Sequence, residues 1–301
     1  MMRATGSGRY LAYVFLLLTT TIWGSLYVVT RVALETVPPI TLLCLRYLFA
    51  VPVLYAITRL SGKSLFLQPD DRLTIFLIGA LGNFVAIGAQ VFGTKYAGAS
   101  VASLINSINP VFIILFAAVI LGEKLSVRKL LATAATLTGV VIVLGRAPAI
   151  DRVWGIAFSV VSVILWSMSS IFIRQISGKY DPMVITMYAI VVAAVCSIPA
   201  AALELAAMPD VHLFSAKNLL CFVYLGVVCT ALPNLMWNKS LSLIEAGACS
   251  LFYPVQPLVS ASLGIVFLGE KPGVGFVIGG ALIVAGIVYA VMGEGRKVIA
   301  E

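Results

Sequence analysis

Charged side chains are scarce in this chain of 301 residues: only 11% are Asp, Glu, Lys or Arg, whereas 61% are hydrophobic. A soluble domain carries about 25% charged and about 45–50% apolar residues, so the composition excludes a soluble fold. It also excludes a disordered chain, which needs low hydrophobicity and high charge. With a mean hydropathy of +1.08, the chain is expected to be an all-α integral membrane protein, because lipid requires every backbone polar group to be satisfied internally.

Histidine and membrane-embedded acids are also missing. His212 is the only histidine, and all 12 Asp and Glu residues lie at or beyond the ends of apolar stretches. Acid–base catalysis generally needs His or a carboxylate near the reacting group, and zinc proteases need an H-E-x-x-H motif. The sequence therefore disfavours an intramembrane enzyme, and it offers no residues for a proton relay through the membrane. No cofactor is expected.

Neither the cysteines nor the positive charge defines a site. The five cysteines are odd in number, lie in apolar stretches and lack C-x-x-C spacing, so no disulfide framework and no metal site are expected. The net charge is +8, but Lys and Arg are scattered singly or in pairs between apolar runs. This pattern is typical of charges that contact lipid head groups and set topology, and it disfavours nucleic acid as a partner.

Ten apolar stretches are long enough to span a membrane, because a helix crossing about 30 Å of hydrocarbon needs about 20 residues. With the N-terminus inside, 13 Lys and Arg residues fall on the inner side and six on the outer side, so both termini are expected in the cytoplasm. The short connections favour a multi-pass protein of a bacterial inner membrane. The predicted spans are 10–31, 39–60, 72–92, 98–121, 127–146, 153–175, 182–205, 217–239, 244–268 and 273–292.

The chain contains one sequence pattern twice. Residues 22–31 (IWGSLYVVTR) match residues 165–174 (LWSMSSIFIR) at an offset of 143, and residues 109–124 (NPVFIILFAAVILGEK) match residues 256–271 (QPLVSASLGIVFLGEK) at an offset of 147. Two repeats, 1–147 and 148–301, are therefore expected, with five spans each. Because five is odd, the second repeat enters the membrane from the opposite face. Such inverted repeats can open a central cavity to one side at a time, which is the basis of alternating access.

These features resemble the EamA family of the drug/metabolite transporter superfamily. The resemblance covers nearly the whole chain, and its residues are Trp23-Gly24, Arg31, Asn109-Pro110 and the run LGEK at 121–124 with its copy at 268–271. It implies ten transmembrane helices, arranged as two inverted five-helix EamA-like repeats around a central cavity, and export of small metabolites, frequently amino acids. The second repeat departs from the pattern at Ser167, opposite Gly24, and at Ala189, opposite Arg46.

Polar and aromatic side chains recur at helical spacing on six of the spans: the first, third, fourth, sixth, eighth and ninth. Polar side chains inside a membrane helix are costly unless they face protein or water. We therefore expect these six spans to line the cavity and the four plainer ones to surround them. Together with one buried arginine, the candidate substrate-binding residues are Trp23, Tyr27, Arg46, Asn83, Gln90, Ser103, Asn106, Ser107, Trp166, Thr230, Asn234, Trp237 and Tyr253.

Pro110 and Pro257 lie on two of these polar stripes. A proline has no N–H and displaces the carbonyl four residues earlier, which belongs to Asn106 in the first case and to Tyr253 in the second. A freed carbonyl in the membrane is tolerated where it is buried in protein or lines a water-filled cavity. The sequence leaves open whether these prolines shape the cavity or only kink a packed helix.

Arg46 is the only charge deep inside a predicted span. An intramembrane arginine needs a partner and marks a candidate site. It either attracts a substrate carboxylate, caps free carbonyls or extends its head group towards the surface. The aromatic candidates have a similar pair of interpretations, because they either stack on the solute or pack the helices together.

The sequence thus predicts a secondary transporter that exports a small metabolite, an amino acid or a similar amphipathic solute, by alternating access. Without a buried carboxylate, we expect facilitated diffusion or exchange. A lipid flippase or a channel is the alternative, and an intramembrane enzyme is less favoured. The expected partners are the solute and membrane lipid, and the motif Gly275-x-x-x-Gly279 permits close helix approach within the bundle or in a homodimer.

Overall fold

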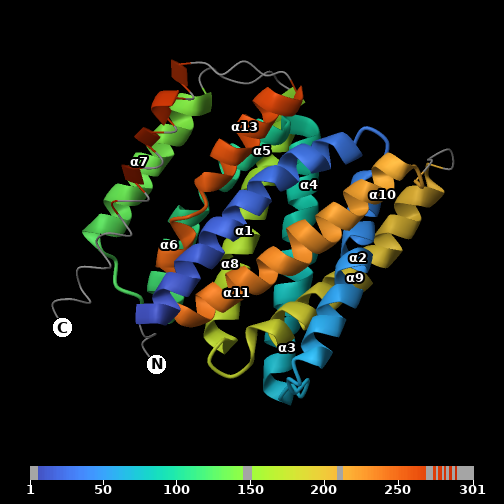
Figure 1. The fold of residues 1–301 in the computed structure, drawn as a ribbon, viewed down its shortest axis with the longest axis horizontal. Helices are drawn as coiled ribbons and strands as arrows, with labels where there is room; N and C mark the ends of the chain where they lie inside the picture. The colour runs from blue at the N-terminus through green and yellow to red at the C-terminus, as the bar shows by residue number, and fades with distance from the viewer. Residues whose placement is uncertain are drawn as a thin grey trace.

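The computed structural model describes residues 6–144, 151–208 and 213–268, together with short runs of residues between 274 and 289. This part of the chain is a helical bundle without a strand (Figure 1). In chain order its elements are α1 (Gly6–Ala33), α2 (Pro39–Leu60), η1 (Pro69–Asp71), α3 (Arg72–Leu77), η2 (Ile78–Val85), α4 (Ala86–Ala97), α5 (Ala99–Asn106), α6 (Asn109–Leu121), α7 (Val127–Leu144), α8 (Asp151–Ile176), α9 (Pro182–Ala206), α10 (Ala216–Val223), η3 (Tyr224–Ala231), α11 (Leu232–Leu243), α12 (Ala246–Ser250) and α13 (Val255–Leu268).

Eight segments are long and apolar enough to cross a membrane, and they coincide with eight of the predicted spans. α7 covers the predicted fifth span. Most of the predicted tenth span, 273–292, lies outside the described residues, although the positions described between 274 and 289 are helical. The eight segments are Gly8–Ala33, Pro39–Leu60, Pro69–Ala97, Ala99–Leu121, Val153–Ile176, Pro182–Ala206, Ala216–Leu243 and Ala246–Phe267.

The third and eighth spans each contain a π-helical stretch, η2 in one and η3 in the other. In η2, the Asn83 side chain donates to the carbonyl of Ile78, five residues earlier, at 3.0 Å. In η3, the Thr230 hydroxyl donates to the carbonyl of Leu225, also five residues earlier, at 2.6 Å. These polar side chains therefore bond to the wider turn at equivalent places in the two repeats. Such π-helical turns are rare and are frequent at functional sites.

The fourth and ninth spans are interrupted near their middle, so each consists of two helices where the sequence analysis expected one. α5 ends at Asn106 and α6 begins at Asn109, next to Pro110; α12 ends at Ser250 and α13 begins at Val255, two residues before Pro257. In the turns between the helices, backbone N–H groups donate to carbonyls three residues earlier instead of four. Because neither proline can donate to the regular helix ladder, the break falls at the same position of both repeats.

Equivalent helices pack in equivalent ways in the two halves of the bundle. α1 lies against α11 and α13, whereas its counterpart α8 lies against α4 and α6. A methyl group added to Gly79 would lie 2.7 Å from the carbonyl oxygen of Ala189, and one added to Gly226 would lie 2.7 Å from the carbonyl oxygen of Arg46. Both pairs follow the offsets found in the sequence. Glycine permits this close backbone approach because it has no side chain.

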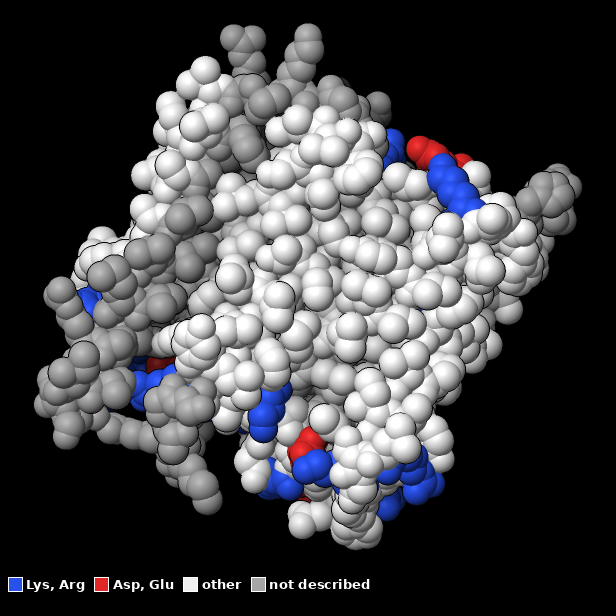
Figure 2. Space-filling view, viewed as in Figure 1, with Lys and Arg blue, Asp and Glu red and all other residues white. Residues whose placement is uncertain are grey.

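α2 and α9 lie side by side and antiparallel at one side of the bundle (Figure 1). Near one end of the pair, the Glu204 carboxylate of α9 accepts the backbone N–H of Thr41 in α2 at 2.7 Å. At the opposite end, Lys63 pairs with Asp181 at 3.0 Å. Most charged side chains on the visible face of the molecule lie at its two ends, and the surface between them is largely uncharged (Figure 2). This distribution is expected of a bundle embedded in lipid between two aqueous layers.

The motif at Gly275 contacts the chain's own bundle. A methyl group added to Gly275 would lie 2.7 Å from the carbonyl oxygen of Ile142 in α7. Close helix approach at this glycine therefore takes place within the chain. The homodimer interpretation of the motif stays a prediction.

Candidate functional site

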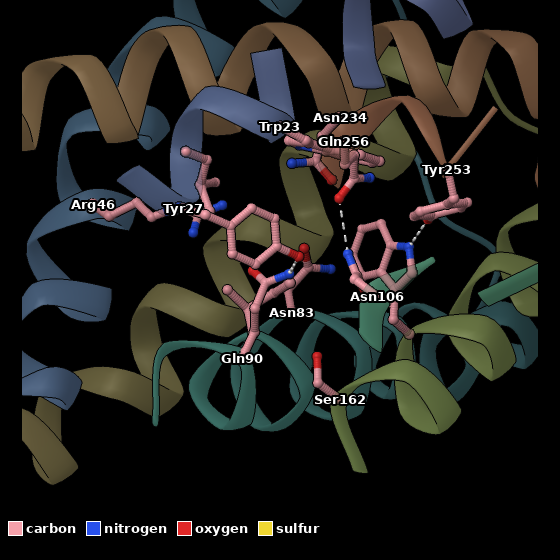
Figure 3. A pocket seen from close by; sticks show the side chains of 13 residues that line it. Trp23, Tyr27, Arg46, Asn83, Gln90, Asn106, Ser162, Asn234, Tyr253 and Gln256 are labelled. Carbon is pink, nitrogen blue, oxygen red and sulfur yellow. Dashed lines mark hydrogen bonds between the residues drawn. The ribbon is translucent and has the colours of Figure 1, made fainter. Parts of the chain in front are cut away.

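A small, closed cavity lies at the centre of the bundle, between the two halves (Figure 3). The space open to the centre of a water-sized sphere is about 20 Å³, which is room for about one water molecule. Twelve of the thirteen lining residues are buried, and only Gln90 is partly exposed. In this conformation the cavity is therefore narrow and largely buried. The lining residues are Trp23, Leu26, Tyr27, Arg46, Asn83, Ile87, Gln90, Asn106, Ser162, Trp166, Asn234, Tyr253 and Gln256.

Nine of the thirteen predicted site residues come together in this wall, from α1, α2, η2, α4, α5, α8, α11 and the turn before α13. All six spans expected to line the cavity contribute to it, and Arg46 adds the second span. The nine residues are Trp23, Tyr27, Arg46, Asn83, Gln90, Asn106, Trp166, Asn234 and Tyr253.

The other four predicted residues are buried but lie outside the cavity wall. The hydroxyls of Ser103 and Ser107 bond to the carbonyls of Ser100 and Ser103, at 2.9 and 3.4 Å. Thr230 lies behind the wall and holds Arg46 from there. Trp237 packs behind Tyr253, with ring centroids 5.0 Å apart. Helical spacing selected spans that contribute to the cavity wall, but it did not show which of two neighbouring polar positions lies in that wall.

Four lining residues were absent from the predicted set: Leu26, Ile87, Ser162 and Gln256. Each lies three or four residues from a predicted residue of the same span. Helical spacing from the predicted residues could therefore have identified them. Ile87, for example, lies between Asn83 and Gln90. Leu26 and Ile87 were missed because the prediction counted only polar and aromatic residues, whereas binding cavities are lined mainly by apolar groups.

Arg46 enters the cavity from α2, next to Tyr27 (Figure 3). Its side chain is 4% exposed, so it does not extend towards the membrane surface. Its Nε donates to the hydroxyl of Thr230, while its Nη1 is buried without a hydrogen-bond partner. The bond to Thr230 thus fixes the orientation of the guanidinium, while at least one of its N–H donors has no hydrogen-bond acceptor.

A chain of amides crosses from α6 to the opposite wall of the cavity. The carbonyl of Asn106, which Pro110 leaves without its helical donor, accepts the Asn109 side-chain Nδ2 at 2.7 Å. The same Nδ2 also donates to Asn106 Oδ1 at 2.6 Å, and Asn106 Nδ2 donates to Gln256 Oε1 at 3.0 Å (Figure 3). Ser167, where the second repeat departs from the pattern, bonds to Asn109 Oδ1 at 2.9 Å. Pro110 therefore interrupts the helix and also frees the carbonyl that anchors this network of side-chain amides.

An aromatic cluster closes the remaining side of the cavity. The ring of Trp23 lies 5.6 Å from those of Trp166 and Trp237 and 6.1 Å from that of Tyr253. Trp166 Nε1 donates to the Tyr253 hydroxyl. Trp23 and Trp166 are equivalent positions in the two repeats, so the cluster joins the halves. These rings offer an apolar surface with edge-to-face contacts, which suits an amphipathic solute.

Hydrogen bonds and ion pairs close the end of the bundle that we name the Lys179 end, defined by Lys179, Asp71 and Glu123. Lys179 pairs with the Asp71 carboxylate at 3.0 Å, which raises the pKa of the lysine. The Glu123 carboxylate, at the end of α6, accepts the backbone N–H groups of Ala246 and Gly247 at 2.9 and 3.3 Å. Glu123 therefore ties the fourth span to the ninth. Its copy, Glu270, lies outside the described residues.

Hydrogen bonds and an ion pair also join the helices at the opposite end, which we name the Lys217 end. Lys217 donates to the Glu35 carboxylate at 2.8 Å, and this bond lowers the pKa of Glu35. Arg31 donates to the carbonyl of Lys95 at 2.9 Å, at the end of α4. Its repeat counterpart, Arg174, donates to the carbonyl of Leu241 near the end of α11 at the Lys179 end. The two matching arginines therefore hold the same helix pair in each half.

Among the described residues, no group of three or more His, Cys, Asp or Glu side chains lies close enough to hold a metal ion. The cavity wall contains one cation, amides, hydroxyls and aromatic rings, and none of its residues is acidic or histidine. This arrangement can bind a small solute, but it lacks the usual general acids and bases.

Eight membrane-length helices around a closed, polar and aromatic cavity define a multi-pass membrane protein of the transporter class. The pattern of the EamA-like transporter family matches residues 10–145 and again residues 153–292. The chain therefore belongs to the EamA-like transporter family, within the drug/metabolite transporter superfamily.

Individual relatives agree with this assignment. An uncharacterized transporter of Archaeoglobus fulgidus is 27% identical over 282 residues, covering 93% of this chain and 98% of the relative. Protein PagO of Salmonella typhimurium is 25% identical over 256 residues, covering 84% and 83%. A protein of known crystal structure shares the fold with a TM-score of 0.77 at 24% identity, covering 98% of this chain and 99% of that one.

Proposed function

We propose that the protein is a secondary transporter that exports a small amphipathic metabolite, such as an amino acid, by alternating access. The observation that supports this most is the closed cavity between the repeat-related helices, lined by a buried cation on one side and aromatic rings on the other. A cavity holding about one water molecule must widen to admit a metabolite. Substrate entry therefore requires the helices around it to move.

The repeated packing of the bundle supports such a movement. In the proposed arrangement, residues 1–147 and 148–301 each form five transmembrane helices, ten in all, and the second set is inverted. α7 is the fifth helix, and the helical positions between 274 and 289 belong to the tenth. The equivalent glycine contacts, π-helical turns and proline breaks supply two similar halves that can exchange conformations. Broken helices around a central site are a feature of this kind of transporter.

The distribution of charge supports an orientation with both termini in the cytoplasm of a bacterial cell. The Lys179 end includes Arg59, Lys63, Arg72, Arg174, Lys179 and Lys239, whereas the Lys217 end includes Arg31, Lys95 and Lys217. Cytoplasmic segments carry the excess of Lys and Arg, which assigns the Lys179 end to the inner side. In that orientation the Glu123 contact closes the cytoplasmic side of the cavity.

The absence of acids from the described cavity wall supports facilitated diffusion or exchange down a metabolite gradient. A proton-coupled carrier normally uses a buried Asp, Glu or His. The protein is thus proposed to have no enzymatic activity and to need no cofactor.

Reconstitution into liposomes tests the function directly. Vesicles preloaded with an extract of host metabolites are expected to show saturable counterflow of at least one labelled metabolite, and empty vesicles are not. Mass spectrometry of cells with and without the gene narrows the choice of metabolite first. Uptake that never saturates would point to a channel, and proton influx stoichiometric with the solute would reject the coupling proposed here.

A lipid flippase is the second candidate, because one observation favours it. An apolar pocket of about 330 Å³ lies between α1, the start of the eighth span and α13, with Val28, Val32 and Phe267 in its wall. However, none of the residues that line this pocket is charged, so it has no cationic site for a phosphate head group. Movement of fluorescent phospholipid between leaflets in the same vesicles would select the flippase; the proposed transporter predicts none.

A further inference from the structure

A buried guanidinium lies in the cavity wall without a carboxylate partner. Among the described residues, the ion pairs formed by Lys63, Lys179 and Lys217 lie at the ends of the bundle, and none involves Arg46. Its Nη1 is buried and unpartnered, and its Nε has the neutral hydroxyl of Thr230. Leaving a buried charge uncompensated is unfavourable unless a partner arrives. Arg46, which carries this unpartnered donor, lines the space where a solute must bind.

A second residue of the cavity wall, Gln256, also carries an unpartnered atom, and the chain of amide hydrogen bonds shows that this atom is a donor. Asn109 must point its Nδ2 at the backbone carbonyl of Asn106, because a carbonyl only accepts. Asn106 Oδ1 is then the acceptor for the same Nδ2, which leaves Asn106 Nδ2 to donate to Gln256 Oε1. The free atom of Gln256 is therefore the donor Nε2, buried without a partner. The two buried unpartnered atoms of the lining residues are both donors.

Packing of the bundle does not require the arginine. The backbone of Arg46 meets Gly226 in the same close contact that the backbone of Ala189 makes with Gly79 in the other repeat. An alanine thus satisfies this helix contact at the equivalent position. The two repeats share this helix contact, but only the first repeat has a guanidinium at this position.

From these observations we propose that Arg46 binds the anionic group of the solute, and that the cavity selects small organic acids with a net negative charge and an apolar or aromatic body. The carboxylate contacts Arg46 Nη1, the apolar body lies against the aromatic cluster, and Gln256 Nε2 takes a further acceptor where the solute has one. No acidic residue lines the described wall to receive an ammonium group, so zwitterions bind less tightly and cations least. This assignment deepens the transporter function and rests on it for its physiological meaning.

Three compounds with one ring and different charges test the proposal: 3-phenylpropanoate, phenylalanine and phenethylamine. Binding to the purified protein in lipid nanodiscs is measured by quenching of tryptophan fluorescence, because Trp23, Trp166 and Trp237 lie in the cluster. The exposed Trp154 is replaced by Phe to lower the background. We expect affinity to fall in the order anion, zwitterion, cation, with the anion at least about tenfold tighter than the cation, as for a charged hydrogen bond.

Variants of Arg46 assign the preference to this residue. Arg46→Gln is expected to weaken 3-phenylpropanoate binding by about 10- to 100-fold and to abolish the preference for the anion over the zwitterion and the cation. Arg46→Lys is expected to keep this preference. Arg59→Gln, on the exposed end of the same helix, changes neither. Should Arg46→Gln fail to fold, Thr230→Val, which removes the partner of Nε, is expected to weaken binding of the anion and leave that of phenethylamine unchanged.

The outcomes separate this site from the transporter function. Equal or tighter binding of phenethylamine, no binding of 3-phenylpropanoate, or an unchanged order in folded Arg46→Gln overturns the anion site. Counterflow of a metabolite without any anion preference rejects the site and leaves the transporter. An anion preference that depends on Arg46, in a protein that shows no counterflow, supports the anion site and rejects the transporter function.

Discussion

At the scale of single residues, the cavity depends on side chains whose partners come from distant parts of the sequence. Arg46 and Thr230 are 184 positions apart, and Asn106 and Gln256 are 150 apart. Each bond joins one repeat to the other. Small changes at these positions are therefore expected to alter which polar atoms face the cavity.

Arg46→Ala copies the residue at the equivalent position of the second repeat, Ala189. We expect it to lower solute export to a small fraction of the wild-type rate while surface abundance stays the same, because Arg46 contributes only its backbone oxygen to the contact with Gly226. Export from cells and quantitative surface labelling measure the two effects. If protein abundance falls in proportion to export, the arginine is structural.

Gly226→Ala is expected to destabilise the protein, because the added methyl would lie 2.6 Å from Phe49 Cβ and 2.7 Å from a backbone oxygen. Overpacking of this kind costs about 1–3 kcal/mol. Gly178→Ala is the matched control, since nothing lies within 4 Å of its added methyl. Thermal melting in one detergent compares them, and equal melting temperatures would contradict the close contact.

At the scale of elements, the two broken spans distinguish this bundle from a set of straight helices. The break between α5 and α6 frees a carbonyl, and Asn109 uses that carbonyl to align the amides across the cavity. A continuous helix would supply this carbonyl with a backbone donor and leave Asn109 without its fixed acceptor. The interruption therefore controls which atoms face the solute.

Pro110→Ala restores a backbone N–H that can bond to the Asn106 carbonyl. We expect thermal stability to stay the same or rise, while export falls because the amide chain loses its alignment. Export assays and melting curves on the same variant test this. Wild-type export by a stable Pro110→Ala protein would show that the proline only kinks a packed helix.

Glu123→Gln tests the tie between the fourth and ninth spans. The amide keeps one acceptor but loses the charge that strengthens the bonds to the backbone N–H groups of α12. We expect the Lys179 end to open more often, so that the buried Cys249 of α12 reacts faster with a water-soluble maleimide. The measurement uses a chain in which Cys249 is the only cysteine. Glu245→Gln, just before α12, is the control, and an equal increase there would mean that opening is not specific to Glu123.

At the scale of the whole molecule, the proposal depends on two halves that face opposite sides of the membrane. α2 and α9 run antiparallel to one another, and the contacts at their ends fix that direction. The equivalent arginines, Arg31 and Arg174, lie at opposite ends of the bundle. An inverted pair is expected to show both features.

Short tags at the two chain ends are expected to be protected from protease in intact cells and cleaved together in inside-out vesicles. Five spans in each repeat place both ends in the cytoplasm, because an even total returns the chain to its starting side. Tags on opposite sides would exclude an even number of spans and with it the inverted five-helix arrangement. A periplasmic marker protein serves as the control for membrane integrity.

The sequence predicted much of this architecture because its signals are local or repetitive. The offsets that pair Trp23 with Trp166 predicted the repeats, and helical spacing selected nine residues that line the cavity. It did not predict the π-helical turns, since Asn83 and Thr230 read as ordinary polar positions until their five-residue bonds are seen. It also missed Gln256, whose role depends on an amide in the other repeat.

The sequence by itself determined that the chain folds in lipid, that it is built twice from one pattern, and that a single cation lies deep among apolar helices. These properties follow from composition and periodicity, which each stretch of chain carries on its own. Only the tertiary structure decided which atoms meet: that Arg46 is held by Thr230 with one donor free, that Gln256 has a free donor, and that the cavity has room for about one water molecule. Contacts between the halves depend on rotation and depth of packed helices, and small differences in either exchange one neighbour for another.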